Sequence, residues 1–244
     1  MSLSDHLITP DWPAPFNVRA MQTTRRGGVS IAPYDSLNLG LHVGDSALAV
    51  EQNRMRLSQF FPSEPVWLEQ VHGTAVADAD SAVCLPRADA CITRRGVCVV
   101  MTADCLPILL CDKAGTVVGA VHAGWRGLAA GVIEAAVAAM DAAPENLMAW
   151  LGPAISQPAF EVGEEVRAAF VDADKDAEAA FMQGLEGKYQ ADIYALARRR
   201  LNLLGIADIY GANRCTYREP EHFFSYRRDG STGRMGTFIW LQGR

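Results

Sequence analysis

The sequence predicts a single-domain α+β protein, a mixed α/β fold whose mostly β centre is covered by helices on its outer faces. Residues 97–122 are almost continuously apolar, which is typical of strands buried on both faces. The pattern then changes to a helical period in residues 125–142. No linker, repeat or low-complexity tract divides the 244 residues, so we expect one domain over residues 1–244.

The first half of the chain predicts a strand, a long loop, a helix and a series of short strands. Residues 16–24 alternate as a strand does, and residues 25–45 form a loop long enough to be functional. A helix capped by Asp45 or Ser46 is expected to run to about Phe61. Short strand candidates follow at residues 65–73, 88–93, 96–104, 106–112 and 116–124.

The second half of the chain mixes helices with strands. The helix expected over residues 125–142 is rich in alanine, which allows close packing on a sheet. A strand is expected at Leu147–Gly152, and a later helix should end at Gly205. The remaining expected segments are helices at about 164–171 and 191–204, the segment DIYGAN, a polar-aromatic stretch over 215–234 and a last strand at 235–242.

Charge and composition limit the possible partners. The 22 Lys and Arg residues are outnumbered by 28 Asp and Glu residues, which gives a net charge of -6 and argues against a nucleic-acid or anionic-lipid surface. A local basic pocket for a small anion is still compatible with this balance. No signal-peptide pattern and no run of eighteen apolar residues is present, so we expect a cytoplasmic protein without membrane contact. No coiled-coil seam demands a partner, and a monomer is expected.

The six cysteines do not form a disulfide framework in a chain of this size, and in a reducing compartment they should be thiols or metal ligands. Cys84, Cys91, Cys98 and Cys105 recur every seven residues, a spacing that would align them on a helix. Because the stretch VCVVMTADC is β-branched and flanked by breakers, we interpret it as a strand and the spacing as coincidence.

Three strand ends carry potential metal ligands. His72 in QVHG and His122 in VHAG share a local context, and Cys105 lies in TADCLP before a proline. Taken singly, a buried Cys is most often a packing residue and a His at a strand end most often a hydrogen-bonding one. Their spacing matches no short metal motif, but the shared context favours one site. Three such ligands suit zinc with an open fourth position.

Most of the chain resembles the laccase-domain, or YfiH-like, family. The resemblance lies in TTRRGGVSIAPYDSLNLGLHVGD, NRMRL, LEQVHGT, ADACIT, TADCLPILLCD, VHAGWRGLAAG, LGPAISQPAFEVGEEV and CTYREPEHFFSYRRDGSTGR. It implies a layered α/β/β/α sandwich, and it implies that His72, Cys105 and His122 are catalytic and bind a metal, Zn2+ with Cu2+ as a possible substitute. The sequence keeps the family pattern at these residues and their flanks.

Members of this family have been described as multicopper polyphenol oxidases, peptidoglycan editing factors and zinc-associated purine nucleoside phosphorylases with adenosine deaminase activity. The resemblance therefore implies a small-molecule enzyme that uses a purine nucleoside and phosphate. The substrates would be adenosine, inosine and methylthioadenosine, converted to free base and ribose 1-phosphate. Adenosine deamination would occur at the same site, through a water activated by zinc.

Further residues are candidates for binding substrate. Arg126, at the start of the helix expected over 125–142, could bind phosphate with the helix's free N–H groups, or it could be a solvated side chain. Asp104 could orient a ligating histidine or act as a general base, although strand neighbours such as Asp104 and Cys105 point to opposite faces. Phe223, Phe224 and Tyr226, beside Arg227 and Arg228, could stack a purine and bind an anion, or they could be core aromatic residues with exposed arginines.

The early loop adds three polar candidates among its leucines. Ser36, Asn38 and His42 could line the same pocket, or they could hydrogen-bond the backbone of their own loop. Both alternatives are open at the level of sequence.

Other functions fit the same residues. With Cys105 as nucleophile and His122 as base, the protein would be a hydrolase or amidase that edits peptidoglycan precursors. Copper-dependent polyphenol oxidation would be incidental, because five histidines are too few for a conventional multicopper centre. A structural zinc site in a binding module fits poorly, since structural zinc is normally four-coordinate.

Overall fold

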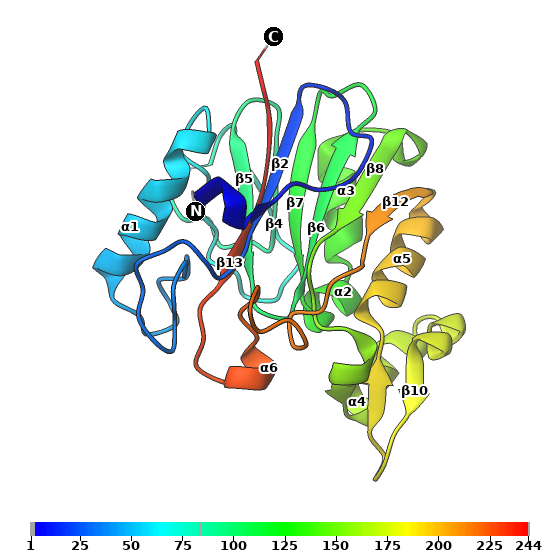
Figure 1. The fold of residues 1–244 in the computed structure, drawn as a ribbon. Coiled ribbons are helices and arrows are strands. Elements are labelled where there is room, and N and C mark those ends of the chain that lie inside the picture. The colour runs from blue at the N-terminus through cyan, green and yellow to red at the C-terminus, as the bar shows by residue number, and fades with distance from the viewer. Residues whose placement is uncertain (1–2, 83, 244) are drawn as a thin grey trace.

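The structure, a computed structural model, describes residues 3–82 and 84–243. Two β-sheets lie face to face at its centre, and a layer of helices covers the outer face of each sheet (Figure 1). This arrangement confirms the mixed α+β class and the α/β/β/α layering.

The smaller central sheet has the strand order β1-β2-β13-β5. Its strands are β1 (Leu7–Ile8), β2 (Val18–Thr23), β13 (Met235–Leu241) and β5 (Val97–Thr102), and all neighbours are antiparallel. Alternate residues of β5 face opposite layers. Cys98 and Val100 face the other sheet, whereas Val99 packs toward Leu57 of helix α1 (Ala47–Leu57), which covers the outer face (Figure 1).

The larger sheet has the order β12-β8-β6-β7-β4-β3. Its strands are β12 (Asp208–Gly211), β8 (Leu147–Leu151), β6 (Leu106–Asp112), β7 (Val118–Ala123), β4 (Ala90–Thr93) and β3 (Val76–Asp78). The outer face packs on α2 (Trp125–Ala130), α3 (Val132–Met140) and α5 (Ile193–Leu204). The first and last strand pairs, β12 with β8 and β3 with β4, are parallel, and the others are antiparallel.

A small lobe lies beside the end of α5 (Figure 1). It contains the three-stranded sheet β10-β11-β9, formed by Phe181–Gln183, Tyr189–Ala191 and Glu161–Val162, together with α4 (Glu164–Val171). The short helix α6 (Tyr226–Asp229) lies in the segment before β13. The 3-10 turns are Leu3–His6, Ser58–Phe60, Pro144–Asn146, Gln157–Ala159 and Lys175–Ala180.

Several expectations are corrected by the structure. Residues 65–73 form no strand, only isolated bridges from Val66 and Glu69. The helix expected over 125–142 is divided into α2 and α3 at Gly131, whose φ of +99° interrupts the helix and favours glycine. The three-stranded sheet, the strands β1 and β3 and the helix α6 were not expected, and the segment DIYGAN contains β12. The other strands and helices lie where the sequence predicts them, and Gly205 ends α5.

Within residues 3–82 and 84–243, the structure contains no helix with the length and apolar character needed to cross a bilayer.

Candidate metal and ligand site

The three predicted metal ligands meet at one end of the layer between the two sheets. His122 is near the end of β7, on the face shared with Val118 and Ala120, which pack between the sheets. Cys105 precedes β6, and by the alternation of a strand it belongs to the same face as Leu109. His72 arrives from a loop, with a φ of +60°. The fold therefore brings together residues from three separate segments.

The ligand atoms are close enough for one ion. Cys105 Sγ lies 3.8 Å from His72 Nε2, and the rings of His72 and His122 are 4.8 Å apart between centroids. All three ligand atoms lie within 4.8 Å of one another. Tetrahedral zinc, with ordinary Zn–S and Zn–N bond lengths, would place sulfur and nitrogen about 3.5 Å apart. The donor set and its spacing therefore fit zinc after a small adjustment.

Asp89 organises two of the ligands, and sequence reasoning missed it. Its fully buried carboxylate accepts hydrogen bonds from the backbone N–H groups of Val71 (3.1 Å), His72 (2.9 Å) and Gly73 (2.7 Å). The same carboxylate accepts the Nδ1–H of His122 at 2.8 Å. The available signal was that Asp89 directly precedes β4 and alternates onto the face of Cys91 between the sheets.

The contact with Asp89 fixes the orientation of His122. Asp89 and His122 are neighbours across the β4–β7 pair, and the backbone N–H of His122 also donates to the carbonyl of Asp89 at 2.7 Å. Because Nδ1–H is donated to the carboxylate, Nε2 is the nitrogen presented to Cys105 and His72. Burial alone would raise the pKa of Asp89, but the hydrogen bonds from His122 and the loop lower it below its usual value.

Cys105 and His122 change each other's protonation in the metal-free protein. Burial alone would raise the pKa of the Cys105 thiol, but the charge of His122 and the hydrogen bonds of both imidazoles outweigh burial and lower it to about 6. Burial alone would lower the pKa of His122, but the charges of Cys105 and Asp89 raise it to about 9. The pair is therefore a thiolate and an imidazolium at neutral pH.

These ligands open into a cavity of about 540 Å³, a size typical of small-molecule sites. Its walls combine aromatic, apolar and cationic side chains. The lining residues are His42, Gln70, His72, Met101, Thr102, Ala103, Cys105, His122, Trp125, Arg126, Tyr226 and Arg234.

Two of the predicted substrate-binding residues line this cavity. Arg126 is exposed, and its guanidinium lies over the neighbouring ring of Trp125, 4.4 Å from the centroid. His42 reaches the cavity from the early loop, and burial, followed by the charges of Arg234 and Arg54, lowers its pKa below the usual value.

Ser36 and Asn38 are not among the lining residues of the cavity and hydrogen-bond their own loop. Ser36 Oγ accepts the N–H of Gly28 at 3.1 Å. Asn38 is fully buried, and its Oδ1 accepts the N–H groups of Gly40 and Arg234, each at 2.9 Å. Asn38 therefore ties the early loop to the residue that precedes β13.

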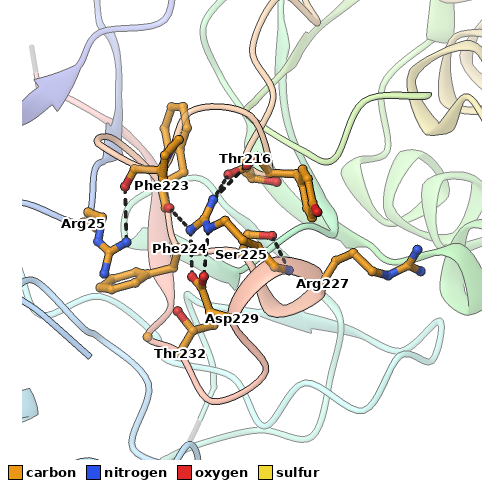
Figure 2. A network of polar contacts seen from close by, with 12 residues as sticks. Arg25, Thr216, Phe223, Phe224, Ser225, Arg227, Asp229 and Thr232 are labelled. Carbon is orange, nitrogen blue, oxygen red and sulfur yellow. Dashed lines mark hydrogen bonds and ion pairs between the residues drawn. The ribbon is translucent and has the colours of Figure 1, made fainter. Parts of the chain in front are cut away.

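Phe224 and Arg227 also lie outside the cavity lining. Phe224 is fully buried, with the guanidinium of Arg25 over its ring at 4.8 Å. The side chain of Arg227 points away from the surrounding network (Figure 2) and donates to the carbonyl of Glu161 at 2.8 Å. The observed positions match a core aromatic residue and an outward-pointing arginine.

Asp104 anchors the polar-aromatic segment and does not contact the histidines. It has a φ of +87°, and its carboxylate accepts the hydroxyls of Thr216 (2.6 Å) and Ser225 (3.0 Å) and the N–H of Arg227 (2.7 Å). The role of orienting a histidine, considered for Asp104, belongs to Asp89.

A second anchor in this segment is Arg228. Its guanidinium donates to the carbonyls of Thr216 (2.8 Å) and Phe223 (2.9 Å) and pairs with Asp229. This network crosslinks the loop on both sides of α6 and so fixes Tyr226 at the mouth of the cavity. Tyr226, one of the aromatic residues considered for stacking a purine, lines the cavity. Arg234 is a cavity residue that sequence reasoning missed, because its position depends on long-range hydrogen bonds.

Comparisons with known proteins agree on one family. The family model described as "Multi-copper polyphenol oxidoreductase laccase" matches residues 19–242. A relative in Escherichia coli (strain K12), named purine nucleoside phosphorylase YfiH, is 58% identical over 240 residues, covering 96% of this chain and 98% of the relative. A Pseudomonas aeruginosa relative, also named a purine nucleoside phosphorylase, is 54% identical over 238 residues, with the same coverage of 96% and 98%.

Solved structures share the fold. A crystal structure from Neisseria meningitidis has a TM-score of 0.95 and 51% identity, covering 98% of this chain and 100% of that one. The structure of YlmD from Geobacillus stearothermophilus has a TM-score of 0.86 and 34% identity, covering 95% and 94%.

Proposed function

We propose, from the premise that this chain belongs to the multi-copper polyphenol oxidoreductase laccase family, that it is a zinc-dependent purine nucleoside phosphorylase which also deaminates adenosine. The observation that carries the proposal is the cluster of His72, Cys105 and His122 at a nucleoside-sized cavity. We assign these three residues as metal ligands and catalytic residues. The names of the bacterial relatives support the phosphorylase activity.

Phosphorolysis would proceed by exchange at the ribose C1′ atom. An oxygen of phosphate forms a bond to C1′ as the bond from C1′ to the purine nitrogen breaks, and the electron pair leaves with the base, which takes up a proton. The products are free base and ribose 1-phosphate. In this chain, Arg126 and Arg234 supply cationic groups for phosphate, and Trp125 and Tyr226 supply aromatic surface for the nucleoside.

Adenosine deamination would use the same cavity. Water adds to C6 of the purine and ammonia leaves, so the products are inosine and ammonia. Zinc bound at such a site supplies Lewis acidity and lowers the pKa of a water ligand toward about 7. The contribution of Asp89 is to hold His122 with Nε2 directed at the cluster and to hold the His72 loop by its backbone.

The test follows adenosine, adenine, inosine and hypoxanthine by chromatography, with and without phosphate, using protein of measured zinc content. We expect base release that requires phosphate and is lost after chelation and in Cys105→Ala. The matched control is Cys84→Ala, because Cys84 is exposed and lies outside the cavity lining. If zinc-replete, folded wild type turns over no nucleoside, the proposal fails.

One observation favours a second candidate, a cysteine hydrolase or amidase acting on cell-wall precursors. Cys105, His122 and Asp89 form a chain of thiolate, imidazolium and carboxylate, as in enzymes with a cysteine nucleophile. Such an enzyme should keep its activity after chelation, whereas the zinc phosphorylase should lose it. Metal removal therefore separates the two candidates.

Copper oxidase chemistry is a minor alternative despite the family description. Among the described residues, one group of three or more His, Cys, Asp or Glu side chains lies close enough together to hold a metal ion, and it is the trio itself. Multicopper oxidases need several copper ions, so we propose that phenol oxidation is at most incidental to copper replacing zinc. The expected cytoplasmic location and monomeric state stay predictions.

A further inference from the structure

The cavity has a charge opposite to that of the whole protein. The chain has a net charge of -6, yet among the described residues that line the cavity none is Asp or Glu. Two arginines, Arg126 and Arg234, supply its cationic character. A cationic pocket in an acidic protein is suited to a small anion.

The two arginines differ in how firmly they are held. Arg126 is exposed on the first turn of a six-residue helix and lies over its neighbour Trp125. Arg234 is half-buried, and its Nη1 donates to the carbonyls of Thr232 (2.9 Å) and Gly233 (3.0 Å). Within residues 3–82 and 84–243, Arg234 has no carboxylate at ion-pair distance, and its Nε and Nη2 have no hydrogen bond. A fixed guanidinium with free donors is suited to binding an oxyanion.

The backbone and stem of Arg234 are fixed by the early loop. Asn38 Oδ1 accepts the N–H of Arg234, and the carbonyl of Arg234 accepts the N–H of Leu39 at 3.1 Å. Gly40 lets the loop approach closely, because a Cβ at this position would lie 2.8 Å from Arg234 Cγ. The position of this arginine is therefore set before any ligand binds, which reduces the entropy lost on binding.

A second donor, the Thr102 hydroxyl, lines the same cavity as Arg234. Met235 pairs with Thr102, so Arg234 and Ala103 continue past the end of the β13–β5 ladder, next to Cys105. Thr102 lines the cavity and is 1% exposed, and its Oγ1 has no hydrogen-bond partner in the part of the chain that the structure describes. Buried hydroxyls are normally hydrogen-bonded, so this one points to a ligand.

We propose that Arg234, together with the Thr102 hydroxyl, binds the phosphate that attacks C1′ and so determines whether the site carries out phosphorolysis. This assignment rests on the proposed phosphorylase function. Deamination needs water in place of phosphate, and it should depend on Arg234 less than phosphorolysis does. The two reactions of one site therefore report separately on this residue.

The first experiment measures the KM for phosphate in inosine phosphorolysis. We expect Arg234→Gln to raise this KM at least about tenfold, and Arg234→Lys to raise it less, because a lysine keeps the charge without the fork of donors. Adenosine deamination in phosphate-free buffer should fall by a smaller factor than phosphorolysis does at fixed phosphate, since its step uses no anion. Arg95→Gln, at an exposed turn away from the cavity, is the matched control.

Two further variants, at Thr102 and Arg126, test the assignment. Thr102→Val preserves the shape of the side chain and should also raise the KM for phosphate. An unchanged KM in folded Arg234→Gln and in Thr102→Val would overturn the assignment, as would a rise in Arg126→Gln alone. If Arg234→Gln instead impaired only a nucleoside monophosphate as substrate, the anion bound there would be a 5′-phosphate, and the proposal would be wrong.

A binding measurement separates this inference from the proposed function. Phosphate alone should raise the Tm of wild type, and the Tm increase should be absent in Arg234→Gln that circular dichroism shows to be folded. If wild type turns over no nucleoside but phosphate still stabilises it through Arg234, the phosphorylase function fails and the anion site stands. If wild type is active and the Tm and KM effects of phosphate survive in Arg234→Gln, the anion assignment fails and the function stands.

Discussion

The layer between the two sheets contains cysteines in two different environments. Cys98 and Cys111 lie in the packed middle of the layer, where burial raises the pKa of both thiols, for Cys111 to about 12. Cys105 lies at the cavity end of the same layer, where the neighbouring imidazoles lower the pKa to about 6. The same side chain is thus an inert apolar residue or a thiolate, depending on whether histidines lie beside it.

The largest effect expected at the reactive end follows from removing a ligand. His122→Ala should abolish stoichiometric zinc binding and lower turnover by about 10³-fold or more, because one of three protein ligands is lost and Asp89 loses its imidazole partner. Metal analysis and steady-state kinetics would measure both effects. Full activity in this variant would show that the cluster of His72, Cys105 and His122 is not needed for catalysis.

The next largest effect concerns the residue that orients His122. Asp89→Asn should lower zinc affinity or activity by about 10- to 100-fold, as expected for a carboxylate hydrogen-bonded to a ligating histidine. Asp80→Asn is the control, since Asp80 also accepts hydrogen bonds from a backbone loop, including Arg94 N (2.8 Å) and Gly96 N (3.2 Å), but lies outside the cavity lining. Equal losses in both variants would mean that Asp89 has only a structural role.

A smaller effect is expected in the pH dependence of Cys105 reactivity. In metal-free protein that carries Cys84→Ala, the alkylation rate of Cys105 should be half-maximal near pH 6, because its pKa is lowered and the thiolate forms above that value. Removing the charge of His122 in His122→Ala should move the midpoint upward. A midpoint at the usual thiol value in both proteins would contradict the thiolate–imidazolium pair.

The smallest effect on activity is expected in the packed middle. Cys111→Ala should leave turnover within about twofold while lowering the free energy of unfolding by roughly 1–2 kcal/mol, since it opens a small cavity in the core. Denaturant titration and the nucleoside assay measure the two quantities. A large loss of activity without loss of stability would show that the middle of the layer is coupled to the site.

A mostly β centre covered by helices could be predicted from the residue pattern, the α/β/β/α order of the layers followed from the family resemblance, and the details of the site could be predicted only in part. The apolar runs within residues 97–122 predicted the central strands. His72 and His122 were identified as candidate ligands because each follows a valine and precedes a small residue. Nothing in the sequence indicated that the strand expected over residues 65–73 would not form. The side chain of Gln70 donates to the carbonyl of Met101 at 2.8 Å and accepts the N–H of Met101 at 2.7 Å, so side-chain bonds to β5 take the place of backbone strand pairing.

Asp89 and Arg234 show why the rest was out of reach. Asp89 acts through a cross-strand contact with His122. Arg234 reaches the cavity because β13 pairs with β5, two strands that are far apart in the sequence. Neither pairing has a local signature, because strand partners are chosen by packing of the whole sheet.

The central claim is that His72, Cys105 and His122 hold one zinc ion that the reaction requires. The most direct test titrates zinc into chelated wild type while measuring bound zinc and the phosphate-dependent release of hypoxanthine from inosine. The account predicts that activity rises in proportion to bound zinc and levels off at about one ion per chain. Full activity in folded protein that contains almost no zinc would contradict it.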